Sequence, residues 1–140
     1  PYGFTSITPT VNWTVLFHDE FDREFQTLAK GLQDELLAHA LLLSQFGPGL
    51  GRPTVDTLKG SKHANMKELR FGWQGEVWRV AFAFDPDRQA ILLVGGDKGG
   101  ADQKRFYKWL IGLADARFDT HLAALTAAAA RKEKRHAKKS

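Results

Sequence analysis

The residues best suited to chemistry in this sequence are two arginines, Arg70 and Arg79, which lie in adjacent strand-like segments. The segments are joined at Gln74-Gly75, and a two-residue hairpin turn there places Arg70 directly opposite Arg79. Directly opposed residues have Cβ atoms about 5 Å apart, so like charges at these positions repel each other. Guanidinium groups bind phosphate bidentately, and the pair therefore predicts an anion site, most naturally for phosphate. The alternative is that solvent surrounds both arginines, or that Glu68 neutralises one of them.

A second feature is the alternation of side chains along these two segments. Large apolar residues occupy every second position and predict a side that faces the core. They are Leu69, Phe71, Trp73, Trp78, Val80, Phe82 and Phe84. The opposite side carries the two arginines with Glu68, Ala81 and Ala83, and the small alanines predict open space beside the arginines.

An RNA phosphate bound at this pair would need few other catalytic groups. RNA supplies its own nucleophile, the 2′-hydroxyl, and arginine or lysine stabilises the charge that develops in the transition state. A proton acceptor and a donor are still required, and His63 is the candidate nearest in the chain. Lys59 or Lys98 could take this role with a lowered pKa, and Tyr107 is a further candidate. Each also has an ordinary interpretation, as a loop histidine, a surface lysine or a tyrosine in helix packing.

Basic residues gather on both sides of the arginine segment. Residues 1–49 hold two basic and six acidic side chains, whereas residues 131–140 hold six basic side chains against Glu133. The whole chain has a formal charge of +4, which favours a polyanionic partner. We expect four basic residues around the arginine face to contact RNA: Lys62, Lys67, Lys104 and Arg105.

Other kinds of site have little support. The chain has no cysteine, which excludes disulfides, zinc–cysteine sites and a cysteine nucleophile. Its five histidines show no paired metal-ligand spacing, and the sequence contains no Walker motif or nucleophile elbow. The glycine-rich segment 95–100 lies between a strand and a helix but matches neither glycine fingerprint for nucleotides. We therefore expect neither a metal nor a cofactor.

A small α+β domain must position these residues. Strand-like patterns predict four strands, at residues 13–17, 66–73, 76–84 and 90–94. Helical spacing predicts two helices, or one kinked helix, between Asp19 and Gly47, and a last helix from Phe106 to at least Leu125. A long loop spans residues 47–65. The predicted order is β-α-α-β-β-β-α, an α+β fold in which the helices pack on one face of a small antiparallel sheet.

The chain divides into three parts by composition. We expect a loose lead-in over residues 1–12, a single domain over 13–130, and a basic tail over 131–140 that extends the last helix or frays. No apolar run reaches the length of about 18 residues that a membrane span requires, and no secretory signal is visible. Together with the lack of cysteine, this predicts a cytoplasmic protein that does not bind membranes.

Several segments resemble one known family of proteins. They are LKGS at 58–61, MKELR at 66–70, VWRVAFAFD at 77–85, ILLVGGDK at 91–98 and KRFYKWLIGLAD at 104–115. Over residues 13–125 the chain resembles the RelE/HigB superfamily of bacterial toxins, and is most similar to its HigB-like branch. The resemblance implies a compact fold with N-terminal helices on an antiparallel sheet. It also implies a ribosome-dependent mRNA endonuclease that is neutralised by a cognate antitoxin, expected to be of the helix-turn-helix type.

The resemblance also assigns roles to individual residues. Arg70 and Arg79 correspond to the two sheet arginines of the family, Lys98 to its basic residue after the last strand, and Lys59 to the lysine of its LKG segment. Many relatives have a hydrophobic residue and paired lysines where this chain has Gly-Asp-Lys-Gly at 96–99, so the acid and base are not assigned by position alone.

Two other functions remain open from the sequence. A ParE-like toxin has the same fold but inhibits DNA gyrase without cutting RNA. A non-catalytic RNA-binding domain would bind RNA with a steep salt dependence and leave it intact.

Overall fold

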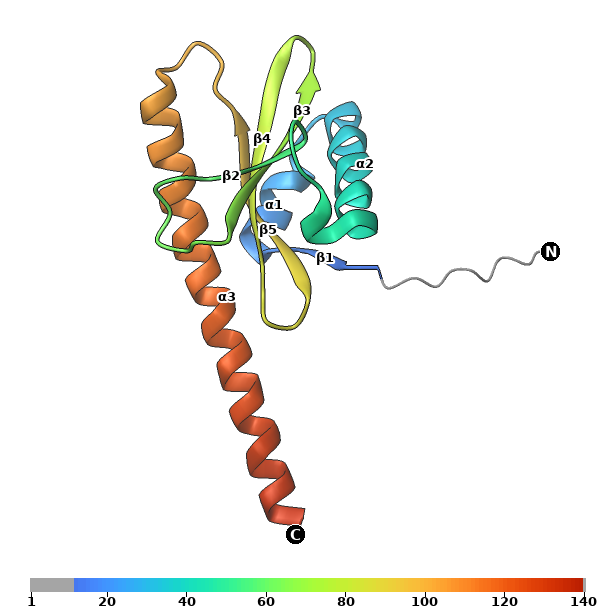
Figure 1. Ribbon diagram of the computed structural model, residues 1–140, viewed down its shortest axis with the longest axis vertical. Helices are drawn as coiled ribbons and strands as arrows, with labels where there is room; N and C mark the ends of the chain where they lie inside the picture. The colour runs from blue at the N-terminus through green and yellow to red at the C-terminus, as the bar shows by residue number, and fades with distance from the viewer. Residues whose placement is uncertain (1–11, 140) are drawn as a thin grey trace, which may run out of the picture.

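The structure is a computed structural model that describes residues 12–139, so almost all of the expected lead-in over residues 1–12 lies outside the described residues. Five strands and three α-helices follow one another along the chain (Figure 1). They are β1 (Thr14–Phe17), α1 (Asp19–Gln26), α2 (Lys30–Phe46), β2 (Val55–Thr57), β3 (Met66–Trp73), β4 (Glu76–Phe84), β5 (Gln89–Asp97) and α3 (Gln103–Lys139). A single turn of 3-10 helix, η2 (Gly47–Gly49), ends α2.

The strands form one sheet in the order β1-β5-β4-β3-β2. The three strands predicted as a meander, β3, β4 and β5, pair antiparallel, while β1 pairs parallel to β5. The α+β class and the order of the predicted elements are therefore confirmed. The difference is β2, a short strand inside the expected 47–65 loop, which pairs antiparallel with β3 and carries Asp56 opposite Glu68.

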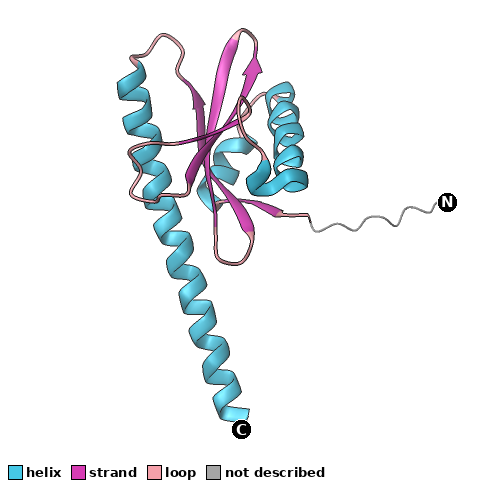
Figure 2. Ribbon diagram, viewed as in Figure 1, coloured by secondary structure: helices cyan, strands magenta, loops and turns pink. Residues whose placement is uncertain are grey.

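The sheet is covered on both faces, as Figure 2 shows. One core joins α1 and α2 to the aromatic side of β3 and β4, which confirms the predicted core-facing side. A second core lies under α3 and includes Ala81 and Ala83, both 0% exposed. The expectation of helices on one face only was therefore wrong. The two alanines do not leave open space, because their small side chains allow α3 to pack closely on the sheet.

Strand β5 explains why two layers are needed. Its central residues, Ala90 to Val94, are all buried, so this strand carries apolar side chains toward both faces and needs helices on each side. At its end, a Cβ on Gly95 would lie 3.1 Å from Val80, and one on Gly96 would lie 3.4 Å from Trp109 of α3. Because neither glycine has a side chain, the helices on both faces of the sheet can pack closely against the end of β5. Gly96 is also the register partner of Arg79.

One buried cation connects the last helix with the first. Arg117 of α3 is 8% exposed and donates to the Glu24 carboxylate of α1 at 2.9 and 2.6 Å, and to the Leu93 carbonyl of β5 at 2.8 Å. The hydrogen bonds to Glu24 raise the pKa of Arg117, so the guanidinium stays charged. This bidentate pair fixes α3 against α1 and β5 at the middle of the molecule.

Helix α3 is much longer than the sheet that it covers. Its 37 residues correspond to about 55 Å of helix, and its C-terminal part runs well past the sheet (Figure 1). The basic tail predicted for 131–140 therefore continues this helix as far as Lys139. Among the described residues, no helix is both long and apolar enough to cross a membrane.

Candidate active site

The two arginines meet as the sequence predicts. Arg70 of β3 is the register partner of Arg79 of β4, and Trp73 is the partner of Glu76 at the end of the hairpin. Gln74 and Gly75 form the two-residue turn, with φ angles of 48° and 80°. Positive φ at both positions is typical of the primed turns that match the twist of paired strands. Glutamine is a poor residue for this conformation, yet the register holds because both strands bury an apolar face.

Each arginine faces its own carboxylate. Arg70 Nη2 lies 3.5 Å from Asp56 Oδ2, and Arg79 Nε lies 3.8 Å from Glu68 Oε1. Asp56 and Glu68 are themselves opposite each other across β2 and β3, and Arg52 Nε also lies 3.3 Å from Asp56 Oδ2. The cluster therefore contains three cations, Arg52, Arg70 and Arg79, against two anions, and most of its positive charge is offset at rest. Glu68 is 5% exposed, and the nearby Arg79 offsets the cost of burying its carboxylate.

The ion pairs are loose and leave donors unused. Charge-assisted N–H to oxygen bonds are usually about 2.7–2.9 Å long, shorter than either pair here. Within the described part of the chain, the buried Nε atoms of Arg70 and Arg79 have no hydrogen-bond partner, although Arg79 Nη1 donates to the Val77 carbonyl at 3.2 Å. Buried donors without a partner are uncommon in proteins. Two guanidinium groups that line one groove and hold their carboxylates at long distance can together bind the oxygens of one phosphate.

A groove of about 420 Å³ gives access to both arginines. Its lining comes from β3, β4 and the segment before β2: Pro53, Thr54, Arg70, Phe71, Gly72, Val77 and Arg79. The side chains of Arg70 and Arg79 are 29% and 16% exposed, so both are partly held by the protein and partly open to a ligand.

The N-terminal part of α3 forms the second wall of the site. The guanidinium carbon of Arg79 lies 5.7 Å from the Tyr107 ring centroid and 5.9 Å from that of Phe106, within the range of cation–π contacts. The Tyr107 hydroxyl donates to Glu68 Oε1 at 2.8 Å. Burial and the Glu68 hydrogen bond raise the pKa of Tyr107, so its phenol stays protonated. Arg79, Glu68 and Tyr107 therefore form one connected group.

The two lysines implied by the family lie on different sides of this group. Lys98 follows β5 two residues after Gly96, the register partner of Arg79, and its Nζ donates to the Ala101 carbonyl at 3.5 Å. Lys59 is exposed, and a Cβ on the next residue, Gly60, would lie 3.8 Å from Ile111 of α3. That contact is one helical turn from Tyr107, or about 6 Å along α3.

The four residues expected to contact RNA lie in three different places. Lys104 and Arg105 are exposed in the first turn of α3, next to Phe106, which touches Arg79. Lys62 instead pairs with Asp119 in the middle of α3. Lys67 lies in β3 opposite Phe82, and strand alternation places its side chain on the face away from the arginines.

His63 is not brought to the arginines. Its Nε2 lies 2.8 Å from Asp119 Oδ1, and its ring meets Phe118 edge-on at 5.0 Å. These residues are twelve positions further along α3 than Tyr107 and Phe106, or about 18 Å along the helix axis. Together with the hydrogen bond of Ser61 to Asp115 at 2.5 Å, this contact fastens the β2–β3 loop to α3.

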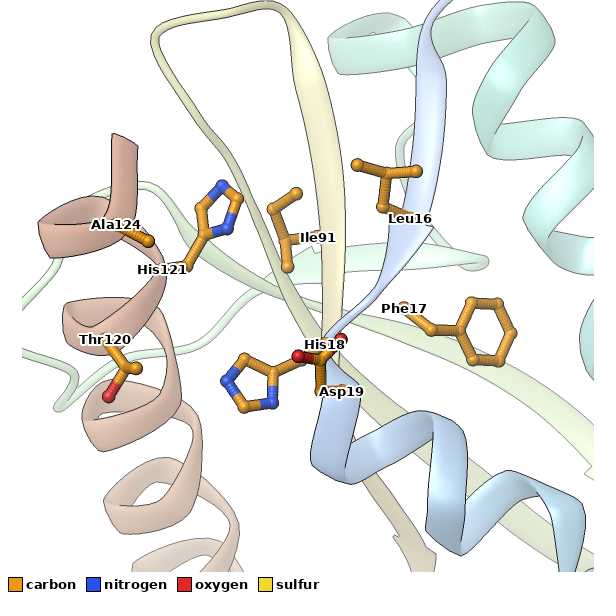
Figure 3. A pocket seen from close by; sticks show the side chains of 8 residues that line it. All are labelled: Leu16, Phe17, His18, Asp19, Ile91, Thr120, His121 and Ala124. Atoms are coloured by element: carbon orange, nitrogen blue, oxygen red, sulfur yellow. The ribbon is translucent and has the colours of Figure 1, made fainter. Parts of the chain in front are cut away.

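Two more histidines line a separate cavity of about 230 Å³, shown in Figure 3. His121 of α3 pairs with Asp85 at 2.7 Å, and His18 accepts a hydrogen bond from the Glu20 amide at the start of α1. Burial and the nearby Arg117 lower the pKa of His18, so its ring stays neutral near pH 7. Over residues 12–139, no group of three or more potential metal ligands is present.

Sequence reasoning missed one member of the site, Asp56, which lies in a strand of only three residues that no periodic pattern marks. Glu68 was named as a possible neutralising partner of one arginine, and it pairs with Arg79. Tyr107 was named among the candidates, but its contact with Glu68 joins residues far apart in the chain. The one available signal was charge. Two arginines on one sheet face need acidic partners, and nearby acidic residues are the candidates.

Comparison with known proteins agrees with this fold. Residues 23–119 match the family model described as phage-derived protein Gp49-like. A Mycobacterium tuberculosis protein named as a candidate toxin, HigB3, is 44% identical over 109 residues, which cover 78% of this chain and 93% of that protein. A second one from the same organism, HigB2, is 54% identical over 84 residues. That match covers 59% of this chain but only 41% of the HigB2 protein, which is therefore substantially longer than the shared segment.

A solved structure has the same fold. The free form of an Escherichia coli RelE toxin, carrying two arginine-to-alanine substitutions, superposes with a TM-score of 0.50, covering 71% of this chain and 94% of that one. Sequence identity in this match is 8%, so it speaks for the fold alone. The chain belongs to the Gp49-like family and, by its match to HigB3, is a HigB-type toxin of a toxin–antitoxin system.

Proposed function

We propose that this protein inhibits translation as a ribosome-dependent mRNA endonuclease, with Arg70 and Arg79 at its active site. The observation that carries the proposal is the pair of opposed guanidinium groups, loosely held by carboxylates and open to a groove. Family membership supports it, since the resemblance to RelE/HigB toxins implies cleavage of mRNA. Residues 13–130 would form the toxin domain, and the protein would act in the cytoplasm.

The reaction is an attack of the RNA 2′-hydroxyl oxygen on the adjacent phosphorus. The new O–P bond gives a 2′,3′-cyclic phosphate, the bond to the 5′-oxygen breaks, and that oxygen leaves as a hydroxyl. Arg70 and Arg79 would hold the two non-bridging oxygens and stabilise the negative charge that grows on them. The carboxylates of Asp56 and Glu68 would then give up part of their contact with the arginines to the phosphate.

Two protons must move in this reaction, one from the 2′-hydroxyl and one to the 5′-oxygen. The Tyr107–Glu68 pair supplies an acceptor and a donor that are already hydrogen-bonded to each other and adjacent to Arg79. Lys98 and Lys59 would add positive charge at the two ends of the site, and either could be the proton donor. His63 would take part only if the loop that Asp119 holds were released.

A cognate antitoxin is implied by the class of protein. We further propose that it is a helix-turn-helix protein that covers the groove at Arg70 and Arg79. Bound mRNA and ribosome would compete with it for the same cations.

The test is induced expression of the wild type and of Arg70→Ala and Arg79→Ala, with transcripts mapped by primer extension. Arg23→Ala, an exposed position on α1, is the matched control for loss of one arginine. New transcript ends in the wild type and control, but in neither site variant, would support the proposal. Growth arrest with intact transcripts and altered DNA supercoiling would support gyrase inhibition instead.

A further inference from the structure

The C-terminal end of α3 is a feature that the proposed active site does not use. We call residues 126–138 the arm. From Thr126 to Lys138 every residue is exposed, and Figure 1 shows this part of α3 extending away from the sheet. The match to the family model covers residues 23–119, so the arm lies outside the matched segment.

The cations of the arm lie on one side of the helix. At 100° per residue, Arg131, Lys132, Lys134, Arg135 and Lys138 fall within about 160° of the helix circumference. Glu133, the acidic residue of the arm, lies on the opposite side. Its neighbours one helical turn away are Ala129, Ala130, His136 and Ala137, so it is not placed to pair with any of the five cations.

The helix dipole alone does not explain the five cations of the arm. Cations stabilise the C-terminus of a helix, but the effect falls off within the last turn. Arg131 and Lys132 lie about two turns before the end of α3, and Arg131–Arg135 and Lys134–Lys138 are like-charge pairs four residues apart. Such pairs destabilise an isolated helix by about 0.2–0.5 kcal/mol each. Within the described residues, none of the five cations has an ion pair, so the repulsion is not relieved by a carboxylate.

The composition of the arm indicates what kind of partner it fits. Protein interfaces depend on buried aromatic or large aliphatic anchors, and alanine is the only apolar residue between Thr126 and Lys138. Asparagine and glutamine, which read base edges, are also missing from this segment. A rigid row of cations without apolar anchors, asparagine or glutamine suits a regular line of phosphates, which is contacted mainly through charge.

We propose that the arm binds the phosphate backbone of double-stranded RNA, separately from the active site. The five cations span about 10 Å along the helix, with Lys134 and Lys138 at one edge of the cationic side and Lys132 at the other. Helical RNA is recognised mostly through its phosphates and 2′-hydroxyls across the wide minor groove, and a straight cationic helix can lie over it. The choice of RNA over DNA rests on the proposed function, because a toxin that acts on ribosomes meets structured RNA there.

The experiment measures binding of the full-length protein to a fluorescent RNA duplex of about 16 base pairs. The duplex is 2′-O-methylated and cannot be cleaved, so its binding does not depend on the proposed endonuclease activity. Affinity is measured by anisotropy between about 50 and 200 mM KCl, for the wild type and for a variant with all five cations changed to alanine. Alanine has the highest helix propensity, and circular dichroism checks that the arm remains helical.

We expect the five-alanine variant to lose about 10²-fold or more in affinity at low salt, and the slope of log K against log salt to fall by about 4. Equal slopes for the two proteins would overturn the proposal. If the two proteins have equal salt slopes but Arg79→Ala abolishes transcript cleavage, RNA binding by the arm is refuted and the proposed function stands.

A charge swap, Arg131→Glu with Glu133→Arg, keeps the net charge and places an acid in the middle of the cationic side. We expect its slope to fall by about 2, because one contact is lost and one repulsion is added. An unchanged slope would show that net charge alone is responsible, which contradicts the proposal. Displacement of the RNA by poly-L-glutamate at equal charge would assign the arm to an acidic protein, and binding of a DNA duplex about tenfold tighter would assign it to DNA.

Discussion

Arg70 and Arg79 are direct cross-strand partners, yet the two guanidinium groups contact different carboxylates, Asp56 and Glu68. This arrangement explains how two like charges are tolerated at adjacent positions. The carboxylates offset the repulsion in the free protein, and their long contacts allow a phosphate to replace them. The acids therefore belong to the site as much as the arginines do.

The first prediction concerns the arginines. Arg70→Ala and Arg79→Ala should each lower the rate of transcript cleavage by about 10²–10³-fold, the usual effect of removing one donor to a developing negative charge. Arg→Lys at either position should restore binding better than cleavage, because lysine cannot bind phosphate bidentately. Rates with purified ribosomes and a defined mRNA check this. A variant that cleaves at the wild-type rate would place the chemistry elsewhere.

The second prediction concerns Asp56. Asp56→Asn removes the charge that contacts Arg70, so Arg70 becomes fully available to RNA. We expect tighter binding of single-stranded RNA, and a slope of log K against log salt that is steeper by the amount expected for about one more phosphate contact. Asp22→Asn, an exposed acid of α1, is the matched control for the change in net charge. Weaker binding by Asp56→Asn than by the control would mean that Asp56 positions Arg70 rather than competing with RNA.

The third prediction separates proton transfer from phosphate binding. Tyr107→Phe removes the hydroxyl that donates to Glu68 and keeps the ring beside Arg79. We expect cleavage to fall by about 10²–10⁴-fold, with RNA affinity and melting temperature little changed. If Tyr107 transfers a proton, the pH–rate profile of the remaining activity should also lose the limb that reports the titration of this group. A parallel loss of affinity and rate would instead indicate that Tyr107 only orients Arg79.

The fourth prediction concerns His63. Because it is bound to Asp119 and lies far along α3 from Tyr107, His63→Ala should reduce stability by about 1–2 kcal/mol and leave most of the cleavage activity. Asp119→Asn should behave similarly, since it releases the same loop. Urea unfolding and cleavage assays on both variants measure this. A folded His63→Ala protein without activity would restore His63 as the acid or base.

The fifth prediction is a pH dependence of stability. Burial raises the pKa of Asp85, but hydrogen bonds from His121, Gln89 and Asp87 outweigh it, so the net pKa is lowered. The resulting stabilisation is present above the ordinary pKa of 3.8 and is lost as the pH falls through the lowered value. Asp85→Asn should therefore reduce stability by about 2 kcal/mol at pH 7 and flatten the loss of stability in acid. An equally steep acid limb in the variant would contradict this.

The sequence was sufficient for the centre of the sheet. Alternating aromatic residues and a two-residue turn determine the register of β3 and β4, and the pairing of Arg70 with Arg79 follows from them. These are local relationships, in which a few neighbouring residues contain the whole signal. The same reasoning located the sheet face that carries the two arginines, but it did not predict that α3 packs on that face.

The remainder depends on contacts between distant segments. Strand β2 has three residues and follows Pro53, so it lacks a pattern of its own and forms only because β3 offers an edge. The second core was hidden because Ala81 and Ala83 can indicate either open space or close packing. The run of apolar residues in β5 was the signal that both faces are buried.

The partial cancellation of charge in the arginine cluster has a consequence for the kinetics of RNA binding. Three cations, Arg52 among them, face two anions within a few ångströms and together produce only a weak field at a distance, so the cluster itself contributes little to the attraction of RNA from solution. We expect the association rate to be set by the exposed cations of Lys104, Arg105 and the arm, and to fall steeply with salt. The dissociation rate would depend instead on Arg70 and Arg79, which act once the phosphate has displaced their carboxylates.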